Sequence, residues 1–186
     1  MGVIQDALNQ NTAAVGDDRR LHTQTVAIDE ATRASLETGE YFILCNGTGG
    51  GHSSVVNGHI LWMKNTSISQ NCLIQSISVS SGGSGFWHVA KGGTVSNYDV
   101  TATAVNFNLS SSKTAPVEAF KATTTSGGMT ITGTSMIFGG HVTANAKWVE
   151  PLNGSLVLGT NNSIGMLWYG DSTVAIGIQF YMKDKT

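Results

Sequence analysis

The sequence predicts an all-β fold, an antiparallel β-sandwich of jelly-roll-like type with a short helical arm at its N-terminus. Beyond residue 40, apolar runs of strand length alternate with clusters of Gly, Asn, Ser and Thr such as "SSGGSG" and "LNGS". No helix-length periodic segment separates these runs, which argues against a parallel α/β fold. Roughly ten short strands with turn signals between them are typical of a β-sandwich or jelly roll.

The first segment, "VIQDALNQNTAAV", has a helical period. Val3, Ile4, Ala7 and Leu8 would lie on one face of a helix. A single helix of this length is marginal in water, so it would have to dock on another surface. The next residues, "GDDRRLH", break the pattern and predict a turn. We therefore expect an arm, helical and then turning, at residues 1–20 and a β-sandwich domain at residues 21–186.

The domain begins with two short elements. "LHTQTVAI" predicts a strand, and "DEATRASLETGE" predicts a short helix with Asp29 as N-cap and Gly39 at the C-cap. Ten further strands are then predicted: Tyr41–Cys45, His59–Lys64, Leu73–Ser80, Phe86–Lys91, Val100–Leu109, Val117–Lys121, Met129–Phe138, Leu156–Leu158, Ile164–Tyr169 and Thr173–Met182.

Two of these strands show a clear period of two. In "TAVNFNLS", Val105, Phe107 and Leu109 would share one face. In "TVAIGIQFYM", five alternating apolar residues would form the buried face: Val174, Ile176, Ile178, Phe180 and Met182. The opposite face of this last strand is small and uncharged, so it suits packing on a second layer, a neighbouring subunit or a loop of the same chain.

Charge is scarce and unevenly placed in the chain. Charged residues are 12% of 186, about half the usual quarter, and the net charge is −2. This balance argues against a nucleic acid or an anionic membrane as the main partner. A domain so poor in charge and rich in Ser, Thr, Asn and Gly is expected to lie against copies of itself or a partner. An ordinary neutral β-domain is the alternative.

The glycine-rich stretch "ILCNGTGGGHSSVVNGHILWMKN" at residues 43–65 does not have the pattern of a phosphate-binding loop. No Lys or Arg occurs between Tyr41 and Met63, and no helix-length pattern follows to supply amide groups. Its glycines favour a long loop between two strands. His52 lies in this loop and is a candidate for an exposed ligand-binding residue.

The sequence predicts no catalytic, cofactor or metal site. The five histidines lack the close spacing of zinc ligands, and the nearest match to G-x-S-x-G, "GTSMI", lacks the last glycine. Cys45 and Cys72 each lie in or beside an apolar run and predict buried free thiols, with a disulfide as the alternative. Five Asn-x-Ser/Thr sequences reflect the composition rather than glycosylation.

The four tryptophans are candidates for a sugar-binding or receptor surface. Trp62 and Trp168 lie in strand-like runs, which favours packing in the core or at an edge. Trp87 follows a glycine-rich turn in "GGSGFWHV" and is predicted to be the exposed ring.

Several segments of the chain resemble a family of virion structural proteins of tailed bacteriophages. The segments are "GEYFIL", "HILWMKNTS", "CLIQSISVS", "NFNLSSSKTAPVEAFK" and the terminal "VAIGIQFYMKD", and the resemblance covers the layout of residues 40–186. It implies a jelly-roll-like β-sandwich, commonly trimeric on the phage particle and without enzyme activity. Such proteins act as capsid decoration or cement, and others lie in the tail or form head fibres.

The resulting hypothesis is a capsid decoration protein that forms a homo-oligomer, as a trimer, on the virion, and binds the major capsid protein or another virion protein. It would be assembled in the cytoplasm of the bacterial host. The arm would supply apolar contacts and planar guanidinium groups for carboxylates of the partner. The expected arm contacts are Val3, Ile4, Ala7, Leu8, Arg19, Arg20 and Arg33.

Two other functions stay open at this point. One is a carbohydrate- or receptor-binding module of the tail or head fibre that uses loop tips such as Gly47–Gly58 and the region of Trp87. The other is an enzyme such as a glycan depolymerase, which the few carboxylates of the domain argue against. No cofactor, nucleic acid or membrane is expected to bind.

Overall fold

The computed structural model describes residues 3–6, 11–15, 21–24, 30–47, 57–123, 129–170 and 172–185. Its strands are β1 (Val3–Asp6), β2 (Asn11–Val15), β3 (Leu21–Gln24), β4 (Tyr41–Cys45), β5 (Asn57–Asn65), β6 (Gln70–Ser81), β7 (Gly85–Ser96), β8 (Val100–Thr101), β9 (Val105–Asn106), β10 (Val117–Lys121), β11 (Thr130–Val142), β12 (Ala146–Leu158), β13 (Ser163–Gly170) and β14 (Val174–Asp184). The helical elements are α1 (Glu30–Arg33) and the π-helical η1 (Ala34–Thr38).

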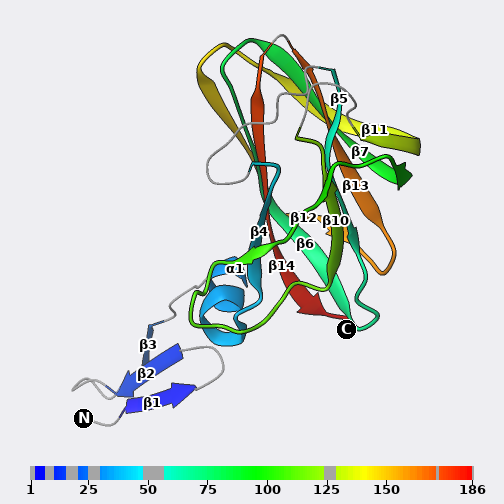
Figure 1. Ribbon diagram of the computed structural model, residues 1–186. Helices are drawn as coiled ribbons and strands as arrows, with labels where there is room; N and C mark the ends of the chain where they lie inside the picture. Colours follow the sequence, from blue (N-terminus) through cyan, green and yellow to red (C-terminus); the bar gives the residue numbers. More distant parts are fainter. Residues whose placement is uncertain are drawn as a thin grey trace.

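Two antiparallel sheets form the body of the protein and confirm the predicted β-sandwich (Figure 1). One has the order β11-β7-β13-β5-β10-β8 and the other the order β12-β6-β14-β4-β9. The chain passes back and forth between the sheets, from β4 to β5, β6 and β7, and again from β11 to β12, β13 and β14. The strands β11-β7-β13-β5 of the first sheet and β12-β6-β14-β4 of the second form two four-stranded sheets, and this connection between them is that of a jelly roll. β8, β9 and β10 extend the two sheets along one side.

The core lies between the sheets and is filled by aliphatic and aromatic side chains. All five residues of the predicted apolar face of β14, from Val174 to Met182, are buried. Phe180 stacks on Phe42 of β4, with ring centroids 5.6 Å apart. Trp168 of β13 lies opposite Trp87 of β7, and both side chains are fully buried. The alternation read from the sequence therefore fixes which face of the C-terminal strand packs inward.

Buried asparagines tie the connections to the sheets. The Nδ2 of Asn65 donates to the carbonyl oxygens of Gln70 and Leu158, at 2.9 and 2.8 Å, and its Oδ1 accepts from the backbone N–H of Ser67. Asn46 is held in a similar way against β14. Because both side chains are buried, neither can accept a glycan in the folded protein, in agreement with the compositional interpretation of these two sequences.

The short predicted helix before β4 is confirmed as the consecutive elements α1 and η1. Gly39 ends it with φ +62°, a left-handed conformation that suits glycine, and its N–H donates to the carbonyl of Ala34. Ala31 and Ala34 pack on Tyr181 of β14. The predicted C-cap is therefore correct, while Asp29 lies outside the described residues.

Two predictions differ from the structure. The predicted helix of the arm is wrong where the structure describes it, because Val3–Asp6 and Asn11–Val15 are strands that pair antiparallel, and β2 also pairs with β3. The alternating run around Phe107 forms only the two-residue strands β8 and β9, and Val105, Phe107 and Leu109 are exposed. Its apolar alternation does not face the core, because this segment lies in the long connection between β7 and β11.

Candidate functional surface

The outer face of the six-stranded sheet carries exposed aromatic rings, but Trp87, which was predicted to be exposed, is not one of them. Consecutive residues of a strand point to opposite faces. Trp87 is only 1% exposed and packs in the core, where its ring meets Phe138 edge to face at 5.9 Å. Its neighbour Phe86 points outward and is 55% exposed. The prediction that Trp87 is the exposed ring is therefore wrong, and Phe86 takes that place.

Four side chains on this face form what we call the ring surface: Phe86, His88, His141 and Tyr169. Tyr169 of β13 and His141 of β11 both pair with Phe86 of the intervening strand β7, so the three residues form one row across the sheet. The rings of Phe86 and His141 lie 4.9 Å apart, and those of His88 and Tyr169 lie 5.7 Å apart. The ring surface thus consists of aromatic rings, with the imidazole nitrogens of two histidines and the phenol hydroxyl of Tyr169 as its polar groups.

Two shallow hollows of about 420 and 450 Å³ adjoin the ring surface. Gly139 and Gly140 form part of the floor of the first. A Cβ on Gly139 would lie 2.3 Å from the backbone oxygen of Trp87, and a Cβ on Gly140 would lie 3.0 Å from its indole ring. Glycine is therefore required at position 139 for the close approach of β11 to β7, and this keeps the surface flat.

Burial governs the protonation of two histidines on this sheet. Burial lowers the pKa of His88 from its ordinary value. It also lowers the pKa of His59, where a backbone hydrogen bond with Met129 opposes the shift. The buried atoms His59 Nε2 and His88 Nδ1 have no hydrogen-bond partner among the residues that the structure describes. Both rings therefore favour the neutral form near neutral pH.

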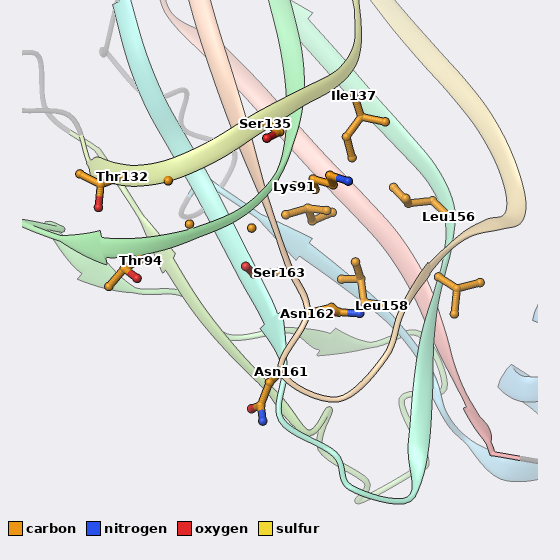
Figure 2. A pocket seen from close by; sticks show the side chains of 15 residues that line it. Lys91, Thr94, Thr132, Ser135, Ile137, Leu156, Leu158, Asn161, Asn162 and Ser163 are labelled. Atoms are coloured by element: carbon orange, nitrogen blue, oxygen red, sulfur yellow. The ribbon is translucent and has the colours of Figure 1, made fainter.

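A larger cavity of about 630 Å³ lies between the paired strands β7 and β11 and the β12–β13 turn (Figure 2). Its polar lining comprises hydroxyl groups, the amides of Asn161 and Asn162, and the ammonium group of Lys91. Leucine and isoleucine side chains from β11, β12 and β13 complete the wall. The lining can form hydrogen bonds with a polar solute, but it includes no carboxylate or imidazole for acid–base chemistry.

The described residues contain no group of three or more His, Cys, Asp or Glu side chains that could hold a metal ion. Cys72 is buried and Cys45 half-buried, and both are free thiols. Burial raises the pKa of each thiol, although the nearby Lys121 opposes this rise at Cys45. Both thiols are therefore poor nucleophiles in the folded protein.

The structure gives a partial view of the predicted arm contacts. Val3 and Ile4 lie in β1. Arg33 is a half-buried residue of α1 whose side chain is 43% exposed and whose Nε is 3.9 Å from Glu37 Oε2. The other predicted site residues lie outside the described residues: Ala7, Leu8, Arg19, Arg20 and His52. The structure thus leaves most of the proposed arm contacts as predictions.

Sequence reasoning missed the exposed apolar residues that adjoin the ring surface. Met136 and Ile137 of β11 are 60% and 42% exposed and line the first hollow. A signal was present in the sequence, because no charged residue occurs between Lys121 and Lys147. The period of two in "GFWHV" would likewise have placed Phe86 and Trp87 on opposite faces.

Among the described residues, no helix is long and apolar enough to cross a membrane. No protein-family model, curated protein or solved structure matches the chain.

Proposed function

We propose that this chain is a non-enzymatic structural protein of a tailed-bacteriophage virion, a capsid decoration protein that self-associates as a trimer and binds the major capsid protein or another virion protein. It would be assembled in the cytoplasm of the bacterial host. The proposal rests on the resemblance of residues 40–186 to such proteins and on the character of the exposed surface.

The observation that carries the proposal is the exposed apolar area beside the ring surface. Phe86, Tyr169, Met136 and Ile137 are all exposed on one sheet, in a domain with few charges. Large exposed apolar patches on folded proteins mark sites of interaction with other molecules. Protein interfaces are enriched in aromatic residues and Met and are depleted of charge at their centre, and this surface has both features.

The N-terminal arm is the proposed anchor to the shell. In a trimer, binding of one arm would raise the effective concentration of the other two at the shell. Three weakly binding arms would therefore give a higher overall affinity than a single arm. The arginines would pair with carboxylates on the shell. Arg33 remains accessible for this role, because its ion pair with Glu37 is long and solvent-exposed and therefore contributes little.

The test of the anchor is deletion of residues 1–20 followed by binding to purified shells. We expect a truncated protein that loses the strands β1 and β2, keeps the circular dichroism spectrum of a β-sandwich, and no longer sediments with shells. A matched variant, Arg19→Lys with Arg20→Lys, keeps the charge but loses the planar fork, so it should bind with an intermediate affinity. Full occupancy of the shells by the truncated protein would show that the arm is not the anchor.

A second function is favoured by the ring surface itself. Exposed rings beside shallow hollows with imidazole and hydroxyl groups suit a carbohydrate, which combines apolar ring faces with hydrogen-bonding edges. This function predicts that Phe86→Ala abolishes binding on a glycan array or to host cells. The matched variant Trp148→Ala removes an exposed ring on β12 of the other sheet and should have no effect. A decoration protein would bind shells and ignore both glycans and cells.

A further inference from the structure

The two sheets of the sandwich have four edge strands, and three of them are protected against pairing with another chain. β8 and β9 are only two residues long. β12 carries Lys147, Glu150 and Pro151, and its register shifts between Pro151 and Leu156. Short length, charge, proline and irregular register are the devices by which proteins prevent edge-to-edge association.

The fourth edge strand, β11, has little such protection. It is 13 residues long, with the sequence "TITGTSMIFGGHV", and contains neither a charged residue nor a proline. Its backbone departs from a regular strand at two places, at Gly133, which has φ +76°, and at a shift in register between Met136 and Phe138. Among the described residues, β7 is its only strand neighbour (Figure 1). Within the same part of the chain, Thr130–Val142 forms no backbone hydrogen bond outside that ladder. Its other edge therefore presents backbone N–H and C=O groups that have no partner in the described part of the chain.

We propose that β11 pairs antiparallel with β11 of a second copy of this chain, across a two-fold axis near Met136. An antiparallel pair of identical strands is self-complementary, and its axis passes through the middle residue of the strand. Thr130–Val142 is centred on Met136. Two six-stranded sheets then become one continuous sheet, and the unpaired backbone groups of each copy find partners.

The composition of β11 favours a copy of itself as the occupant. Like charges directly opposite each other destabilise a strand pair. Because β11 contains no Asp, Glu, Lys or Arg, two copies of it can pair without such repulsion. The exposed side chains of Met136 and Ile137 would meet their counterparts near the axis and lose contact with water. The pairing also places the two ring surfaces close to the junction, because β11 contributes His141 to each.

This contact goes beyond the proposed decoration function and does not depend on it. A two-fold contact cannot by itself form a trimer, so in a trimeric protein it would join one trimer to another. The solution mass of the full chain should therefore correspond to a dimer, or to a hexamer if the trimer also forms. A monomer, or a trimer alone, at concentrations of about 100 μM would overturn the proposal.

The first variant places charge on the edge, with Met136→Lys and Ile137→Lys in one chain. Two lysines close to the axis would face two more in the partner, and we expect the dissociation constant of the two-fold contact to rise about a hundredfold or more. The matched control is Val149→Lys with Val157→Lys on β12, where the exposed fractions are similar, 48% and 46%. The control should keep the mass of the unmodified protein. An unchanged mass in the β11 variant would contradict the proposal.

Cysteine cross-linking tests the position of the axis without relying on a charged variant. In a Cys45→Ser background, single cysteines are placed at Thr130, Thr132, Ser135, Met136 and Ile137. Only residues near the axis approach their own counterparts closely enough for a disulfide, which needs Cα atoms within about 7 Å. Oxidation should therefore give covalent dimers with a maximum at Met136, a lower yield at Ser135 and Ile137, and few at Thr130. Uniform or absent cross-linking along the strand would refute the two-fold pairing.

Discussion

Replacement of Asn65 by alanine should destabilise the protein more than any surface substitution, because this buried side chain joins the two sheets. Asn65 ends β5 of one sheet, while its amide reaches Leu158 of β12 and Gln70 of β6 in the other. Alanine would leave the buried carbonyl group of Leu158, the half-buried carbonyl group of Gln70 and the buried N–H of Ser67 without these bonds. Each unpaired buried group costs about 1–3 kcal/mol, so we expect a loss of roughly 3–5 kcal/mol in the free energy of unfolding.

Guanidinium unfolding followed by tryptophan fluorescence measures this loss, and Asn57→Ala on the same strand is the matched control. Asn57 is exposed and should change stability by less than about 0.5 kcal/mol. Asn65→Asp keeps the acceptor for Ser67 but points a carboxylate at two carbonyl groups. It should therefore be at least as destabilising at pH 7 and recover partly in acid, as the carboxyl becomes protonated. A loss below about 1 kcal/mol for Asn65→Ala would refute the reasoning.

Two further predictions follow from the outer face of the six-stranded sheet. Gly139→Ala should lower the free energy of unfolding by about 1–3 kcal/mol, because the added Cβ would collide with the backbone of Trp87. Gly159→Ala is the control and should lower it less, because the nearest atom to its Cβ would be 3.4 Å away. Equal losses in the two variants would contradict the packing argument. Stability should also decline as the pH falls below 6.5, the ordinary histidine pKa, because His59 and His88 have lowered pKa values in the folded state and the unfolded chain takes up protons first. The decline should end once the pH is below the folded-state values. Thermal unfolding between pH 7.5 and about 5 checks this, and the double variant His59→Gln, His88→Gln should show a weaker dependence; an unchanged slope would refute the assignment.

The strands of the sandwich could be predicted from the sequence because burial imposes a local pattern. Tyr41–Cys45 and Val117–Lys121 match β4 and β10 residue for residue, and the other eight strands predicted after residue 40 all overlap strands of the structure. β12 was predicted only at Leu156–Leu158, because as an edge strand it is largely exposed and contains Pro151. Such a strand buries too few residues to produce an apolar alternation.

The errors concern features that depend on partners distant in the sequence. The segment beginning at Val3 has a helical period, but the structure pairs β1 and β2 as strands, and no local pattern encodes that pairing. Phe86 and Trp87 are adjacent aromatic residues, and only the register of β7 with β13 decides which of them faces the core. The exposed edge of β11 likewise becomes visible only when the strand order is known, although its lack of charge is present in the sequence.

The most direct test of the proposed assembly is an electron-cryomicroscopy reconstruction of the phage particle that contains the chain, at a resolution that places side chains. We predict a jelly-roll density on the particle in which Phe86, Met136 and Tyr169 are covered by other polypeptides. Density in which these three side chains all face open solvent, or particles from which the chain is missing, would contradict it.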